Sequence, residues 1–240
     1  MMLSMVRRWL GTLIVLMTAT TVLVASPGGP ASVAAETPAG VPTFVAQLPP
    51  TTTQVVRTVS SRKHCRRVYC TVTQAWEREA DGTWRMLREF RSTIGSRGWG
   101  KQREGDRRSP VGVFGIKVTF STGSRAPGPM PWKRRLPTSN VSSRAGADYN
   151  TWVEVPGLRS GDRPSMRWGL VVDYNNVRLR PGVGPRPVPG KGSGIFLHTS
   201  KPGHRWAPTL GCTQVGNPRA MRWIVRWLRP GANPRVVQRL

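Results

Sequence analysis

Short runs of alternating apolar and polar residues recur along most of the chain and predict β-strands. These runs occupy Gln54–Val59, Tyr69–Trp76, Trp84–Phe90, Val111–Thr119, Thr151–Val155 and Arg167–Tyr174. Clusters of Gly, Pro, Asp and Ser separate them, and Asp81-Gly82 lies between two runs as a hairpin signal. The pattern therefore predicts a mainly β fold.

One segment instead has the spacing of a helix. Four apolar residues repeat at the i, i+3, i+4, i+7 positions of a single helix face: Met221, Ile224, Val225 and Leu228. Asn217 can cap this helix, Pro218 suits its first turn, and Pro230-Gly231 ends it. We expect one amphipathic helix over Pro218–Leu228, with its apolar face toward the core.

The first residues have the pattern of an export signal. Arg7-Arg8 precede an apolar run from Trp9 to Ala25, and Val33-Ala34-Ala35 offers small residues for cleavage. We interpret residues 1–35 as a signal peptide and expect export to the cell wall or the extracellular space. An uncleaved membrane anchor is the alternative, although the apolar run is slightly short for a spanning helix.

The rest of the chain divides into a linker and one domain. Residues 36–53 are rich in Pro, Ala, Thr and Gly without periodic apolar spacing, which predicts a disordered linker. Residues 54–240 have the length of one ordinary domain and can bury a core.

The charge of the chain is strongly one-sided. It carries 37 Lys and Arg against 11 Asp and Glu, a formal charge of +26. Such a charge concentrates a protein on polyanions, and an exported protein meets anionic wall polymers or lipid headgroups first. No motif for nucleic acid is present, so we expect no nucleic-acid partner. Scattered solvated arginines without any ligand are the alternative.

The best candidate for catalysis is a histidine followed fourteen positions later by a cysteine, His198 and Cys212. A thiol is a strong nucleophile as thiolate, and a nearby imidazole that takes its proton favours the thiolate near neutral pH. Gly211 lets the backbone pass close to a substrate. The N–H groups of Gly211 and Cys212 are the natural donors to a developing oxyanion.

Two motifs resemble one known family. His198 followed by Thr209-Leu210-Gly211-Cys212 matches a His then Ser/Thr-x-Gly-Cys signature, and upstream an acid-containing turn from Lys101 runs into Ser109-Pro110-Val111-Gly112-Val113-Phe114. Together they resemble the L,D-transpeptidase catalytic domain, or YkuD-like, family. The resemblance implies that residues 54–240 form two packed mixed sheets, a β-sandwich, with one or a few helices.

The resemblance also implies a reaction. Cys212 would attack the bond between a diamino acid and D-Ala in a peptidoglycan stem peptide, release D-Ala and pass the acyl group to a neighbouring stem as a cross-link, with His198 as base. No cofactor and no stable protein partner is expected. Hydrolysis of the thioester, as in an L,D-carboxypeptidase or endopeptidase, and a basic wall-binding protein with a decayed site are the alternatives.

The residues around His198 and Cys212 match the family pattern less closely than the pair itself. The resemblance implies substrate contacts by Thr199, Thr209 and Gln214, yet Leu210 and Gln214 replace residues that many members carry there. The remaining cysteines, Cys65 and Cys70, are spaced so that a hairpin could join them as a disulfide or leave them unpaired. No cluster has zinc spacing, so no metal is expected.

Overall fold

The computed structural model describes residues 41–159, 164–200 and 202–240. The predicted signal peptide, residues 1–35, lies outside these ranges. The strands are β1 (Gln54–Ser60), β2 (Cys70–Arg78), β3 (Trp84–Thr93), β4 (Gly112–Ser121), β5 (Trp132–Arg134), β6 (Ser139–Val141), β7 (Trp152–Glu154), β8 (Trp168–Val172), β9 (Phe196–Thr199), β10 (Thr213–Val215) and β11 (Arg235–Gln238). The helices are η1 (Thr43–Gln47), η3 (Pro164–Met166), α1 (Pro218–Trp227) and η4 (Pro230–Ala232).

The first three strands form an antiparallel meander, as the alternating pattern predicts. The turn between β2 and β3 contains the expected Asp81-Gly82 pair. Gly82 has a φ of 87°, and the Asp81 carboxylate accepts a hydrogen bond from the Thr83 backbone N–H at 2.9 Å. These local contacts confirm the hairpin, because glycine adopts this backbone conformation without steric cost.

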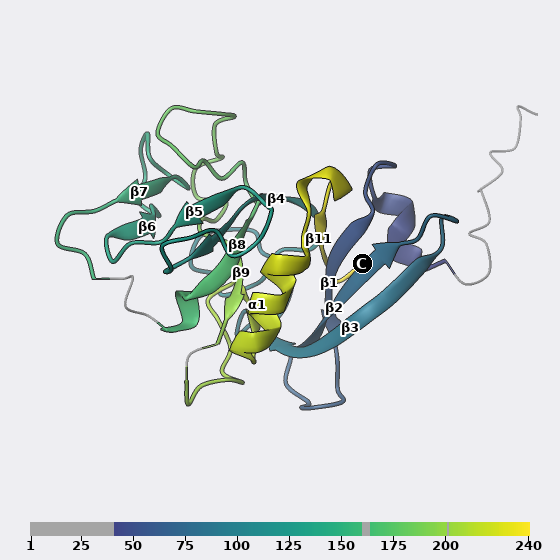
Figure 1. Ribbon diagram of the computed structural model, residues 1–240. Coiled ribbons are helices and arrows are strands. Elements are labelled where there is room, and N and C mark those ends of the chain that lie inside the picture. Colours follow the sequence, from purple (N-terminus) through teal and green to yellow (C-terminus); the bar gives the residue numbers. More distant parts are fainter. Residues whose placement is uncertain (1–40, 160–163, 201) are drawn as a thin grey trace, which may run out of the picture. The chain divides into compact units, whose positions relative to one another are not determined.

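The large sheet closes on itself. Its strand order is β11-β1-β2-β3-β10-β9-β8-β4-β5, and β11 also pairs with β4. The prediction of a mainly β fold with one α-helix is confirmed, but the strands form a closed, barrel-like sheet rather than the expected pair of packed sheets (Figure 1). A separate small sheet contains only β6 and β7.

Strand β11 explains the closure. It runs parallel to β1 on one side and antiparallel to β4 on the other. Both Val236 and Val237 are fully buried, one on each face of the strand. Because both of its edges are hydrogen-bonded, this short strand joins β1 to β4 and closes the sheet.

The predicted helix is confirmed as α1. The Asn217 side chain caps it by accepting the Arg219 backbone N–H at 2.9 Å. The expected apolar stripe, ending at the C-cap Leu228, is fully buried, and α1 packs against β8, β9 and β10 (Figure 1). Its side chains join the largest apolar cluster of the domain, which also draws residues from β1 and β11.

Part of the segment expected to be a disordered linker is structured. Helix η1 lies within residues 36–53, and its Phe44 side chain is fully buried. The Phe44 ring packs edge-on against Trp76 and Trp84 at centroid distances of 5.6 and 6.2 Å. The composition of the segment hid this contact, because one aromatic side chain is enough to bind a short segment to the outside of the hairpin.

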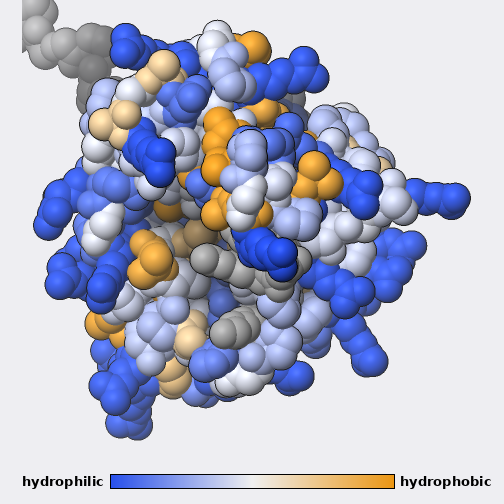
Figure 2. Space-filling model, turned by 90° about the vertical axis from the view of Figure 1, so that its left-hand side faces the viewer, coloured by the Kyte–Doolittle hydropathy of each residue, from blue (hydrophilic) through white to orange (hydrophobic). Residues whose placement is uncertain are grey.

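Two further features complete the description. Cys65 and Cys70 form a disulfide, which decides the alternative that the spacing left open. Among the described ranges, no helix is long and apolar enough to cross a membrane. On the face shown in Figure 2, hydrophilic side chains cover most of the surface and hydrophobic ones gather in small separate patches.

Candidate active site

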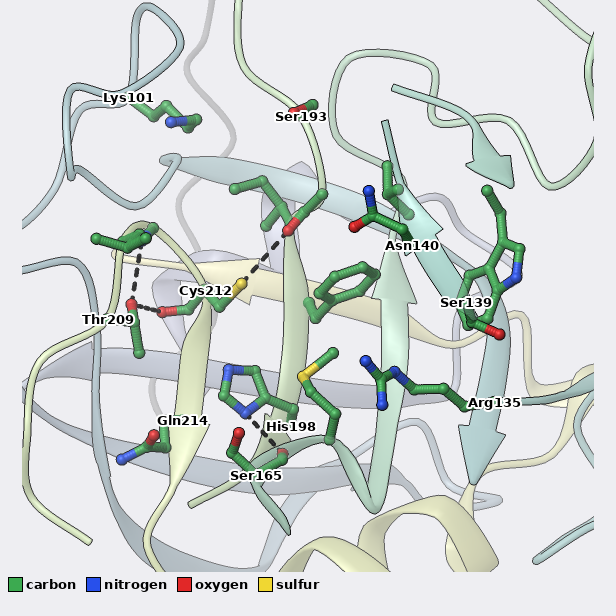
Figure 3. Close-up of a pocket in the computed structure, with 18 of the residues that line it drawn as sticks. Lys101, Arg135, Ser139, Asn140, Ser165, Ser193, His198, Thr209, Cys212 and Gln214 are labelled. Atoms are coloured by element: carbon green, nitrogen blue, oxygen red, sulfur yellow. Dashed lines mark hydrogen bonds between the residues drawn. The ribbon is translucent and has the colours of Figure 1, made fainter. Parts of the chain in front are cut away.

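A cavity of about 420 Å³ opens beside strands β9 and β10 (Figure 3). Its walls come from the loop before β10, the turn that begins at Lys101, helix η3 and the strands β6 and β7. The cavity contains both predicted catalytic residues, His198 and Cys212. The fold therefore brings the two halves of the motif to one place.

The strand register explains why the two side chains line the same cavity. Strands β9 and β10 are parallel, with Thr213 opposite Leu197 and Gln214 opposite His198. Successive side chains of a strand point to opposite faces, so the residue before Thr213 points to the same side as His198. Cys212 is that residue.

His198 is held in one orientation by backbone carbonyls. Its Nδ1 lies 3.0 Å from the Ser165 oxygen and 2.7 Å from the Thr199 oxygen. Because a carbonyl only accepts, Nδ1 carries the proton and Nε2 keeps a lone pair. Figure 3 shows Nε2 on the edge of the ring that faces Cys212. Burial lowers the pKa of His198, and the nearby Arg135 charge lowers it further, so the ring is neutral at neutral pH.

Cys212 is also neutral in the free protein. Its thiol donates to the Gly194 carbonyl at 3.4 Å. Burial raises the pKa of Cys212 to about 11, against the opposing influence of the Phe196 N–H and of Lys101. The sequence led us to expect a thiolate near neutral pH, whereas the surroundings of Cys212 raise the pKa of the thiol and favour its neutral form. Burial disfavours the charged form more than the neighbours favour it.

The residues before Cys212 form a tight turn. The Thr209 hydroxyl donates to the Cys212 carbonyl at 2.6 Å and accepts the Gly211 N–H at 3.1 Å. Gly211 has a φ of 147°, and its carbonyl accepts the Ser109 hydroxyl at 2.7 Å. The Gly211 N–H, which we expected to serve the oxyanion, is therefore already bonded. Thr209 lines the cavity but shapes the turn.

The other two predicted substrate contacts differ. Thr199 is buried and does not line the cavity, because strand alternation turns it away from the face that carries His198. Gln214 does line the cavity, yet its amide donates to the His204 and Arg205 carbonyls at 3.2 Å. Gln214 therefore holds the loop before Pro208 in place, a role that its position in the motif did not reveal.

Residues that the motifs did not identify complete the walls. Lys101, Glu104 and Arg135 supply charge to the cavity, and Ser165 orients His198. Lys101 opens the upstream motif, which was a usable signal, whereas Arg135 and Ser165 lie outside both motifs. No group of three or more His, Cys, Asp or Glu side chains that could hold a metal occurs in the described ranges.

The sequence model of the L,D-transpeptidase catalytic domain, named YkuD, matches residues 72–237. The chain belongs to this family. Strands β3 to β10, with both cavity-forming motifs, lie within the matched range, and most of β2 and β11 is included. The closed sheet with its cavity is the form that this domain takes here.

No curated protein sequence matches the chain. Among solved structures, the chain is similar to the helical cell shape determining protein Pgp2 from Campylobacter jejuni, with 15% identity and a TM-score of 0.42. The match covers 78% of this chain and 47% of Pgp2, so the chain spans about half the length of that protein.

Proposed function

We propose that the protein is an exported L,D-transpeptidase that joins peptidoglycan stem peptides through a thioester on Cys212. The observation that carries this proposal is that His198 on β9 and Cys212, directly before the adjacent parallel strand β10, line the same cavity of about 420 Å³. A cavity of this size can accept the end of a stem peptide.

The neutral pair defines the first step. When a donor stem binds, the Cys212 sulfur attacks the carbonyl carbon between the diamino acid and D-Ala while its proton moves to His198 Nε2. The C–N bond then breaks, and His198 returns this proton to the departing amine. D-Ala leaves, and the acyl group remains on Cys212 as a thioester.

The second step reverses the same path. The amine of a neighbouring stem attacks the thioester carbon and gives its proton to His198. The C–S bond breaks, the sulfur takes the proton back from His198, and the new amide is the cross-link. The Nδ1 contacts with Ser165 and Thr199 stabilise the charged ring during both steps, because carbonyl oxygens favour the imidazolium.

Two alternatives use the same fold. Water in place of the acceptor amine gives an L,D-carboxypeptidase or endopeptidase. A decayed site gives a wall-binding protein, which fits the charge of +26 and the departures at Leu210 and Gln214. The oriented His198 and the close turn at Gly211 favour a working site over a decayed one.

Export to the cell wall is part of the proposal. The Cys65–Cys70 disulfide supports it, since such bonds persist in oxidising compartments. Residues 1–35 supply the signal peptide, and anionic wall polymers or lipid headgroups are proposed partners. Cell fractionation of the tagged full chain tests this, and a cytoplasmic location would contradict it.

Mass spectrometry of stem peptides incubated with the protein tests the reaction. We expect cross-linked products, loss of D-Ala and a transient acyl adduct on Cys212. Cys212→Ala should abolish all three, because it removes the thiol from the cavity. Products that gain only water would identify a hydrolase, and no product with an intact Cys212 would support the decayed site.

A further inference from the structure

The turn that begins at Lys101 is organised around one buried carboxylate. Asp106 accepts backbone N–H groups from Gln102, Arg103 and Arg108 at 2.8 to 3.2 Å. Burial opposes ionisation of Asp106, yet these bonds and the one from Lys101 hold its pKa well below its usual range. The carboxylate is therefore charged at any working pH and fixes the turn.

Lys101 is held against this carboxylate. Its side chain is 2% exposed, and Nζ donates to Asp106 Oδ1 at 3.0 Å and to the Arg103 carbonyl at 3.2 Å. A Cβ on Gly192 would collide with Lys101 Cε, so the glycine lets that segment close over the lysine stem. An ammonium group has three protons, and the two bonds to described residues leave one proton for the cavity.

The ammonium lies beside Gly211, the residue that directly precedes Cys212. A Cβ built on Gly211 would lie 3.6 Å from Lys101 Nζ. Lys101 also lines the cavity that contains the thiol. Inside a protein cavity, a positive charge stabilises a new negative charge on the same cavity wall more than it would in water.

We propose that Lys101 is the cation of the acyl-transfer site, and that its ammonium group stabilises the negative charge that forms on the Cys212 sulfur and on the attacked carbonyl oxygen. This inference rests on the proposed function. Asp106 weakens this stabilisation, because its negative charge offsets part of the positive potential that Lys101 produces at the thiol.

The remaining charged groups at the cavity face other partners. His198 approaches Cys212 from β9 and is neutral in the free site. Arg135 acts on the His198 ring. Glu104 accepts the Tyr149 hydroxyl at 2.8 Å. The charge of Lys101, in contrast, reaches Cys212 itself and lowers the pKa of the thiol against the effect of burial.

The test is the rate of Cys212 alkylation by iodoacetamide against pH in the full chain. Lys101→Met removes the positive charge, so the titration midpoint should rise by about one pH unit. Asp106→Asn removes the opposing negative charge at nearly constant shape, so the midpoint should fall. Lys117→Met is the matched control, because Lys117 also pairs with a carboxylate, Asp173 at 3.1 Å, outside this cavity.

The opposite signs separate an electrostatic role from a structural one. If Lys101 only anchors the turn, both variants should lower the melting temperature, and their titration midpoints should not shift in opposite directions. That result would overturn the inference. Lys101→Arg keeps the positive charge, so its titration midpoint should stay close to that of the wild type. If Lys101→Met does not fold, an unchanged midpoint in Asp106→Asn still overturns it.

Alkylation needs no substrate, so failure of the two proposals can be distinguished. Opposite shifts without any acyl transfer by the wild type would contradict the proposed function alone. With an active wild type, Lys101→Met should lower kcat at least about tenfold with little change in KM, since the charge acts on the transition state.

A different observation carries a second inference. A cleft of about 490 Å³ lies on the other side of the same turn and is lined by six arginines and no acidic residue. These arginines are Arg62, Arg66, Arg67, Arg97, Arg108 and Arg239. None of them forms an ion pair with a described residue. Arg108 is positioned by the Arg97 and Trp99 carbonyls.

We infer that this cleft binds a polymer of phosphodiester groups of the kind found in cell walls. A guanidinium group can donate two parallel hydrogen bonds to the oxygens of one phosphate. Several arginines without an acidic partner in one cleft therefore match a polymer with repeating phosphate groups. A single-stranded nucleic acid would also need exposed aromatic rings for its bases. The one ring here, Trp99, is buried and donates its Nε1 proton to the Ser60 hydroxyl at 2.8 Å.

Two triple variants of equal charge test the cleft. Arg62, Arg66 and Arg67 are changed to Gln in one, and the exposed Arg219, Arg222 and Arg226 of α1 in the other. Binding of the full chain to poly(glycerol phosphate) should weaken at least about tenfold in the first and less than about threefold in the second. Equal losses would assign binding to net charge and overturn the inference, as would tighter binding to oligo(dT).

Discussion

The cavity at Cys212 and the arginine cleft use the two sides of one turn in opposite ways. In the cavity, the buried cation Lys101 is paired with Asp106 and fixed at one point. In the cleft, six exposed arginines have no acidic neighbour in the lining. The comparison teaches that a buried, fixed charge can stabilise charge at one reacting group. Exposed charges instead bind a polyanion through many weak contacts, which salt screens.

The largest expected difference between the two regions follows removal of His198. His198→Ala should reduce thioester formation by about 10²- to 10⁴-fold and leave polymer binding unchanged. Because burial raises the pKa of Cys212 to about 11, the residual rate should keep rising with pH toward that value. Single-turnover mass spectrometry across pH measures it. A wild-type rate in the variant would remove His198 from the mechanism.

A smaller effect is expected from Gly211→Ala. Its φ of 147° is strained for alanine, and the new Cβ would lie 2.9 Å from the Arg108 carbonyl. We expect a loss of roughly 1 to 3 kcal/mol in the free energy of unfolding and a slower reaction. Gly190→Ala is the control, since it has a φ of 73° and open space. Equal activity in both variants would show that the close approach is unimportant.

The smallest effect should follow removal of the Cys65–Cys70 disulfide. It should change polymer binding in the cleft and leave the reaction at Cys212 unchanged. Cys70 and the arginines of the Cys65–Cys70 loop line the cleft. Replacing both cysteines by serine should cost about 2 kcal/mol of unfolding free energy. Polymer binding should weaken a few-fold, while acylation of Cys212 by a carbapenem continues at the wild-type rate. Calorimetry and labelling measure these; slower labelling would mean that the two regions are coupled.

Local patterns predicted the longer elements well. The Asp81-Gly82 hairpin and the helix capped by Asn217 depend on neighbours within a few residues, and both are confirmed. Strands β5, β6, β9, β10 and β11, each of only three or four residues, were missed. Such strands exist through their partners, so no periodicity within them could reveal β11 as the strand that closes the sheet.

The site divides in the same way. The motif identified His198 and Cys212, and the structure places both in the lining of one cavity. The motif could not show that the Gly211 N–H is bonded or that Gln214 holds a loop. Those roles depend on which groups the fold places within hydrogen-bond distance.

The sequence by itself identified His198 and Cys212 as the candidate pair and predicted the β-rich fold and the helix, because each depends on residues close together or on a specific motif. Only the tertiary structure decided that the pair is neutral at rest, that Lys101 lies beside Gly211, and that six arginines share one cleft. Burial and the distance between charges set these properties, and both arise when segments far apart in the chain pack together.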